Sequence, residues 1–237
     1  MKNVDIVIIS NAKNDLLLWE THKAIDSLYE SEREILFNVY VVESNHEVNY
    51  DSYRFLSDKH RNVVTIHTTE PFGYHKYLNI GRRAGNSEYV VLCNNDLIFG
   101  KNWASTAIEQ MEKYDIWSAG CVNPNKSNHK DLLESNIDIK YGYGVSNEVT
   151  GWCIFQKREI YNHIGDLDER FDFWYCDNWY AHHLQKLGFY HILVCKSIVY
   201  HHNITEGSTL RREEDIERKE KLTNGGREIY EQVLKET

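Results

Sequence analysis

The sequence predicts an α/β fold in which helices flank a mostly parallel central sheet. Two observations carry this prediction. Apolar, β-branched runs that are continuous enough for strands buried on both faces recur along the first half of the chain, and segments with helical spacing separate them. Strands and helices that alternate at this rhythm form parallel sheets through right-handed βαβ units. The motif GxGxxG is absent, so a dinucleotide-binding fingerprint is missing.

The elements of the first half follow from these patterns in order. The run VDIVIIS predicts the first strand, and the leucines, alanine and isoleucine of the next segment recur on one helical face. Gly85 is typical of a residue that closes a helix. The expected strands cover 4–10, 35–44, 62–67, 88–93 and 115–121, and the expected helices cover 14–30, 49–60, 73–85 and 102–113.

The rhythm breaks after about residue 122. Residues 124–136 are loop-like, and 137–157 read as strands separated by glycine-containing turns. A helix rich in aromatic residues is expected over 173–188 with Gly188 as its stop, followed by a strand over 189–202. The charged tail predicts two helices around the sequence TNGG. We therefore expect one domain over 1–205 and a helical C-terminal tail over 206–237.

Composition narrows the function classes. The 237 residues carry 27 Lys and Arg against 36 Asp and Glu, a formal net charge of −9, which disfavours nucleic acid or an anionic membrane as a general partner. The five cysteines are widely spaced and form no C-x-x-C motif, as expected of core residues in a reduced, cytoplasmic protein of a cell or a virus-infected host. No signal peptide and no apolar run near 18 residues is found, so no transmembrane segment is expected.

The stretch LCNNDLIF places polar side chains directly after a buried strand. Asn94 and Asp96 stand there, at the position where open α/β sheets bind ligands. A carboxylate at this place can bind a hard divalent cation, which prefers oxygen ligands. The alternative is a simple turn, because Asn and Asp commonly end strands.

Two further segments carry candidate chemistry. Asp177 lies among aromatic residues, whose apolar surroundings raise the proton affinity of a carboxylate and suit it to general-base work. The alternative is an acid at a helix start that interacts with the helix dipole. His201 and His202 follow a strand, where an imidazole could add a metal ligand opposite Asp96. The pair His182–His183 sits within a helical pattern and is interpreted as packing or surface histidines.

Taken whole, three motifs resemble the family-2 glycosyltransferases of the GT-A fold. They are EPFGYHKYLNIGRRAGNSEYVVLCNND, GDLDERFDFWYCDNWYAHHLQKLG and VYHH followed by GST, and the resemblance spans about residues 3–209. In the first motif the matching positions are Gly73, Asn79, Gly81, Ala84, Glu88, Tyr89, Asn94 and Asp96. The order and number of the motifs make the resemblance specific for fold and general activity. They say little about the sugars used.

The resemblance implies an inverting, hexosyltransferase-type enzyme that uses a nucleotide-sugar donor, most simply a UDP-sugar, and a divalent cation, Mn²⁺ or Mg²⁺. It implies that Asp96 binds the cation, with His201, or His202 in the alternative register, as a further ligand. Asp177 matches the catalytic base. The implied donor-binding residues are Ser10, Glu43, Asn79, Asn94 and Asp96.

This chain departs from the family pattern at three positions. Cys176 stands where an acid often precedes the base, Trp179 replaces a second acid, and Asn94 replaces the first acid of an Asp-x-Asp motif. Asp172 is therefore the competing candidate for the base.

The aromatic residues Trp152, Phe173, Trp174, Tyr175 and Trp179 fit either core packing or a platform for the apolar faces of sugars. Trp152 and Trp174 are our candidates for acceptor binding.

Two other functions are compatible with parts of the pattern. A non-catalytic sugar- or nucleotide-binding module could share the fold. A nucleotidyltransferase would also use a strand-end acid and a metal, but the first strand–helix loop offers only Lys13 as a basic residue. A glycosidase is disfavoured, because it needs two facing carboxylates and no metal. The acceptor could be a glycan, a lipid-linked sugar, a protein or a modified nucleobase, and the sequence leaves the oligomeric state open.

Overall fold

The computed structural model describes residues 1–45, 47, 59–201 and 216–236 of the chain. The first half contains β1 (Lys2–Ser10), α1 (Asp15–Ser31), β2 (Ile35–Glu43), β3 (Val63–His67), α3 (Tyr74–Ala84), β4 (Tyr89–Cys93), β5 (Leu97–Phe99) and α4 (Trp103–Lys113). The second half contains β6 (Ser118–Val122), α5 (Ser127–Glu134), β7 (Ile139–Tyr141), β8 (Cys153–Lys157), η1 (Arg158–Ile160), α6 (Tyr161–Ile164), α7 (Cys176–Leu187), β9 (His191–His201) and α8 (Ile216–Glu236).

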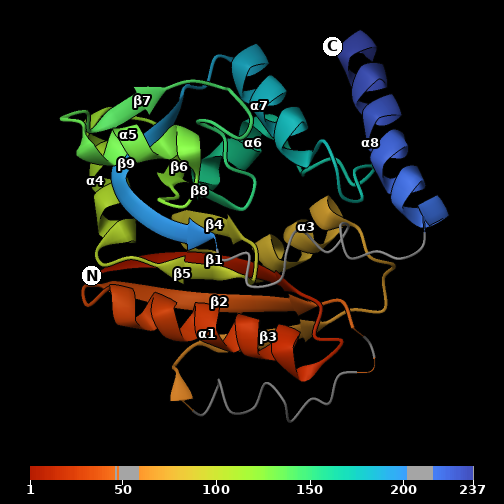
Figure 1. Cartoon of the computed structure of the whole chain (residues 1–237), viewed down its shortest axis with the longest axis horizontal. Helices are drawn as coiled ribbons and strands as arrows, with labels where there is room; N and C mark the ends of the chain where they lie inside the picture. The colour runs from red at the N-terminus through yellow and green to blue at the C-terminus, as the bar shows by residue number, and fades with distance from the viewer. Residues whose placement is uncertain (46, 48–58, 202–215, 237) are drawn as a thin grey trace.

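In this part of the chain the strands join in one nine-stranded sheet of order β3-β2-β1-β4-β8-β6-β9-β5, with β7 paired to β9 (Figure 1). The first four strands pair with one another in parallel, as the βαβ rhythm predicted. The pairing then becomes mixed, because β8 runs antiparallel to both β4 and β6, while β6 and β9 are parallel. An α/β sheet with helices on both faces, as predicted, is thus confirmed, with parallel pairing concentrated in its N-terminal half.

Alternate side chains of the strands pack into two hydrophobic cores, one on each face of the sheet. On β1, Val4, Ile6 and Ile8 pack with α1 and α4, whereas Val7 and Ile9 pack with α3 and α7. Successive side chains of a strand point to opposite faces, so a continuous apolar run is what a sheet covered on both sides requires. The continuous runs that identified these strands therefore reflect helices on both faces.

Three features of the fold outside α7 differ from the sequence prediction. Residues 124–136, expected to be a loop, contain α5, and the short strand β5 follows Asp96 directly. The tail forms one helix through TNGG, since α8 continues across Gly225 and Gly226. A Cβ at Gly226 would lie 2.8 Å from the carbonyl oxygen of Trp174, so this glycine allows close packing and does not break the helix. The expected helix over 49–60 lies mostly outside the described residues, as does the boundary predicted after residue 205.

The aromatic helix begins later than expected. α7 starts at Cys176 because Tyr175, with φ 67°, adopts the left-handed conformation and turns the chain into the helix. Gly188, with φ 75°, ends it in the same conformation, as predicted. The five cysteines are all free and buried. Among the described helices, none combines the length and apolar character needed to cross a bilayer.

Candidate functional site

The polar side chains predicted at the strand ends meet at one edge of the sheet. Ser10 and Glu43 are direct partners at the ends of β1 and β2, and Cys93, which precedes Asn94, pairs with Ile8 on the other side of β1. Because these strands are parallel, their carboxyl ends share this edge. Three of the predicted donor-binding residues, Ser10, Glu43 and Asn94, therefore lie along this edge. A fourth, Asp96, follows two residues after Asn94.

Glu43 shapes the loop that follows β1. Its buried carboxylate accepts hydrogen bonds from the backbone N–H groups of Ala12, at 3.1 Å, and Asn45, at 2.6 Å. Ser10 lies 3.0 Å from the hydroxyl of Thr21, which also accepts from the side chain of Asn95 at 2.9 Å. The two strand-end residues thus fix the β1–α1 loop and connect it to the segment that carries Asp96.

Asp96 and His201 face each other across the β5–β9 pair. Leu97, the residue after Asp96, is the register partner of His201, and His201 Nε2 lies 3.0 Å from Asp96 Oδ1. The ring of His201 also stacks on Trp152, with centroids 5.5 Å apart. The antiparallel return of β9 beside β5 therefore brings together two residues that the sequence predicted as metal ligands.

This pair fits a divalent cation. Asp96 Oδ1 is buried and has no aligned hydrogen-bond donor among the described residues, although the imidazole nitrogen is close. A carboxylate oxygen and an imidazole nitrogen are both ligands of divalent cations, and their 3.0 Å separation would let them contact the same cation. No group of three or more His, Cys, Asp or Glu side chains gathers around a possible metal in the described part of the chain. Two protein ligands with open positions are typical of cations that also bind phosphate.

Asp177 lies in the first turn of α7 against the backbone of Gly151. A Cβ at Gly151 would lie 3.0 Å from the Cβ of Asp177, which is a crowded contact, so glycine favours this close approach. Burial raises the pKa of Asp177 above that of an ordinary carboxyl, and the backbone N–H of Asn178, which donates to Oδ1 at 3.0 Å, opposes the shift. A cavity of about 20 Å³ adjoins the carboxylate, which is room for one water.

Tyr74 connects Asn94, at the strand end near the proposed metal ligands, to Gly151, the residue against which Asp177 packs. Sequence reasoning missed this residue. Its hydroxyl lies 2.9 Å from Asn94 Oδ1 and 3.0 Å from the carbonyl of Gly151, and can donate to either. Burial raises the pKa of Tyr74, and the carboxylates of Asp177 and Asp96 add to this shift, so the hydroxyl lies within the field of both. The sequence signal was an aromatic residue directly after Gly73 in the first motif.

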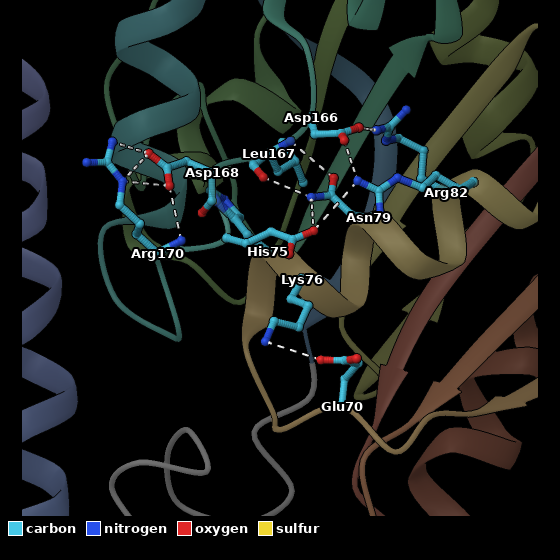
Figure 2. A network of polar contacts seen from close by, with 11 residues as sticks. Glu70, His75, Lys76, Asn79, Arg82, Asp166, Leu167, Asp168 and Arg170 are labelled. Carbon is cyan, nitrogen blue, oxygen red and sulfur yellow. Dashed lines mark hydrogen bonds and ion pairs between the residues drawn. The ribbon is translucent and has the colours of Figure 1, made fainter. Parts of the chain in front are cut away.

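Asn79, predicted to contact the donor, does not join this edge. It is fully buried on α3, where its amide donates to the carbonyl of Leu167 at 2.8 Å and accepts from the N–H of Leu167 at 3.1 Å. Figure 2 shows Asn79 and Arg82 of α3 directed at the segment from Asp166 to Arg170. In this position Asn79 anchors the segment that leads to α7.

The four remaining predicted residues differ in where they lie. Trp152 lies in the site through its stack on His201, and its carbonyl accepts from the N–H of Asn94 at 2.9 Å. Trp174 is 40% exposed and packs edge-on against Phe173. Asp172, the competing base, is near Gly73 and the charges of two lysines, and burial raises its pKa too. His202 lies outside the described residues.

Comparison with known proteins shows the fold. No family model matches the chain. The O-antigen biosynthesis protein RfbC of Myxococcus xanthus is 22% identical over 71% of this chain, which spans only 15% of that protein. The mannosyltransferase PcManGT of Pyrobaculum calidifontis, solved in complex with GDP-Man and Mn²⁺, superposes with a TM-score of 0.66 at 17% identity, over 88% of this chain and 59% of its own.

Two further solved structures agree. GalNAc-T7, solved with UDP, GalNAc and Mn²⁺, has a TM-score of 0.63 at 11% identity over 85% of this chain and 44% of its own. Residues 1–349 of S. aureus TarS give 0.59 at 16% identity, over 84% of this chain and 60% of that structure. The GT-A fold predicted from the sequence motifs is thereby confirmed, while these low identities leave activity to the site itself.

Proposed function

We propose that this chain is a glycosyltransferase that moves a sugar from a nucleoside-diphosphate donor to an acceptor hydroxyl. The observation that carries the proposal is the Asp96–His201 pair at the carboxyl edge of the sheet, with Tyr74 connecting the Asn94 strand end to the turn against which Asp177 packs. Solved structures of the same fold contain GDP-Man or UDP together with Mn²⁺, which supports the proposal.

The donor would lie along the strand ends. Ser10, Glu43 and Asn94 border the edge where nucleotides bind in open α/β sheets, and Glu43 holds the β1–α1 loop through Ala12 and Asn45. A UDP-sugar is our first candidate, with a hexose as the transferred group. Asn79 would act at a distance, by anchoring the segment before α7.

Asp96 and His201 would hold a divalent cation, Mn²⁺ or Mg²⁺. When bound, the cation would offset the negative charge that develops on the departing diphosphate. His202 is the alternative ligand if the histidine register differs by one residue. Trp152 would keep the imidazole of His201 in place through the ring stack.

Asp177 would be the general base of an inverting transfer. Its carboxylate takes the proton of the acceptor hydroxyl while that oxygen forms a bond to the anomeric carbon and the carbon–oxygen bond to the diphosphate breaks. A raised pKa makes the carboxylate a stronger base than an exposed one, and burial is the cause of that shift. Trp152 and the half-exposed Trp174 are the proposed contacts of the acceptor. The acceptor itself would be a glycan, lipid-linked sugar, protein or modified nucleobase.

Calorimetry with UDP and GDP, each with and without Mn²⁺, tests the proposal directly. We expect one nucleotide to bind in the presence of Mn²⁺ and to lose most of its affinity when the metal is chelated. The matching nucleotide sugars should then release nucleoside diphosphate when incubated with the full chain and Mn²⁺. Absence of binding by both nucleotides under both conditions would contradict the proposed function.

A further inference from the structure

A second pocket lies along α7 and shares no lining residue with the small cavity beside Asp177. It has a volume of about 200 Å³ and is bordered by α7, α8 and the segment before β8. Its lining includes Tyr143, Val145, Asn178, His182, Gln185 and Tyr230. In Figure 1, α8 runs beside α7 at the edge of the molecule, and this neighbouring helix supplies Tyr230.

The pocket combines free amides with fixed aromatic rings. Asn178 and Gln185 stand two helical turns apart on one face of α7, and no described residue forms a hydrogen bond with either side-chain amide. Each amide can donate and accept at once. The hydroxyl of Tyr143 donates to the carbonyl of Phe189 at 2.9 Å, and Tyr230 stacks on Tyr175 with centroids 5.6 Å apart. Both rings are therefore held in position before any ligand arrives.

The lining also determines the charge of the ligand. None of the described residues that border the pocket is Asp, Glu, Lys or Arg. A phosphate or a carboxylate would therefore find no Lys or Arg in the lining, and an amine would find no carboxylate. A ligand with several hydroxyl groups and apolar C–H faces matches two free amides and two tyrosine rings. That combination is characteristic of a neutral sugar.

The pocket begins next to the proposed base. Asn178 follows Asp177 in the chain, and its backbone N–H donates to the Asp177 carboxylate at 3.0 Å. Lys126 bonds to the carbonyl of Ser146, beside Val145, and its charge lowers the pKa of Asp177. We infer that this pocket binds a neutral sugar residue of a glycan acceptor. Its role as an acceptor site rests on the proposed glycosyltransferase function. The acceptor class is accordingly an oligosaccharide or a glycan chain.

Saturation-transfer NMR on the full chain tests this inference without donor, metal or turnover. The probes are three neutral trisaccharides, isomaltotriose, α-1,6-mannotriose and chitotriose. We expect saturation transfer to at least one of them in the wild type. Gln185→Ala and Asn178→Ala should each weaken binding by about tenfold, the effect of losing one or two hydrogen bonds. Lys186→Ala is the matched control, since Lys186 is exposed on the same helix and does not line the pocket.

The outcomes separate the pocket from the proposed function. Saccharide binding that is lost in Gln185→Ala and retained in Lys186→Ala supports the pocket, even if nucleotides fail to bind. Metal-dependent nucleotide binding with no saturation transfer to any trisaccharide overturns the pocket and leaves the proposed function standing. Equal saccharide binding in the wild type and in both pocket variants also overturns it, because the sugar then lies elsewhere. Gln185 is exposed, so its substitution leaves the core intact and the comparison interpretable.

Discussion

His201 Nε2 and Asp96 Oδ1 lie 3.0 Å apart, because Asp96 directly precedes β5 and His201 ends β9, the strand that pairs antiparallel with β5. The oxygen is buried and lacks an aligned donor within the described residues. A buried carboxylate oxygen without a hydrogen bond is costly unless another ligand uses it. This relationship supports the proposal that the two side chains bind a divalent cation.

Removal of Asp96 should abolish metal-dependent nucleotide binding. In Asp96→Ala the remaining imidazole cannot hold the cation alone, so calorimetry with UDP or GDP should show no gain on addition of Mn²⁺. His201→Ala should shift the Mn²⁺ requirement to higher concentration and keep nucleotide recognition. Asp131→Ala, at an exposed position on α5, serves as the control. Nucleotide affinity that stays the same in Asp96→Ala would remove this residue from the metal site.

The sequence predicted the parts of this site that follow from strand ends. A buried run that stops on Asn94 and Asp96, and another that stops on His201, identify an edge of the sheet without knowledge of pairing. The sequence could not tell that β5 pairs with β9, because three residues carry little strand signal. It is this pairing of β5 with β9 that brings the imidazole of His201 next to the carboxylate of Asp96.

Tertiary contacts account for what the sequence missed. Asn79 carried a donor role by resemblance, yet its amide is used by the backbone of Leu167, a contact that joins segments far apart in the chain. Gly225 and Gly226 resemble a helix break, yet packing on Trp174 lets the helix continue. Local propensity is a weak guide where burial decides the outcome.

Substitution of Tyr74 tests the connection between the two halves of the site. Tyr74→Phe removes the hydroxyl that reaches Asn94 and Gly151, and should lower the free energy of unfolding by about 1 kcal/mol. Turnover should fall more than this loss of stability explains, because the Asn94 side chain and the Gly151 turn lose their common partner. Tyr190→Phe, on an exposed ring, is the control for both measurements. Equal turnover in the two variants would limit Tyr74 to packing.

The adjacent glycines of α8 should respond in opposite directions to alanine. Gly225→Ala meets nothing within 4 Å and should stabilise the protein by about 0.5–1 kcal/mol, the usual gain of alanine over glycine in a helix. Gly226→Ala drives a Cβ to 2.8 Å from the carbonyl oxygen of Trp174, so α8 must shift and stability should fall. Chemical denaturation of both variants measures the difference. Similar stabilisation by both would show that the close packing on Trp174 is not needed.

Buried histidines should make the fold sensitive to mild acid. Burial lowers the pKa of His191 to about 4 from 6.5, while its ring is bonded to Ser118 and to the carbonyl of Glu148. The unfolded chain takes up the proton first, so stability is complete above pH 6.5 and falls as the pH drops toward 4, by up to about 3 kcal/mol for this residue. Urea denaturation across this range measures the loss.

NMR of the imidazole provides the direct check on His191. Its ring should stay neutral in the folded protein at pH 5.5, where exposed histidines are charged. If the His191 ring titrates near pH 6.5, the predicted contribution of His191 is wrong. Any acid sensitivity of the fold then comes from other groups. His75, whose pKa burial also lowers to about 4, should behave in the same way.

Asp177→Asn tests the mechanism and the energetic cost of the base together. The amide keeps the shape of the side chain but cannot accept a proton, so turnover should fall by about 10²–10⁴ while nucleotide binding stays within a few-fold of wild type. Because burial raises the pKa of Asp177, the folded state holds this proton more tightly than the unfolded state does. The ionised carboxylate therefore destabilises the fold above its unfolded pKa, and Asp177→Asn should be more stable than wild type at pH 7.

The stability gain should disappear below about pH 3.8, where the wild-type carboxyl is protonated in both states. Asp172→Asn is the matched comparison, because burial raises its pKa too, and its effect on turnover should be milder. Near-normal turnover in Asp177→Asn, with a large loss in Asp172→Asn, would move the base to Asp172. A variant that loses both stability and nucleotide binding would instead identify Asp177 as a structural acid at the start of α7.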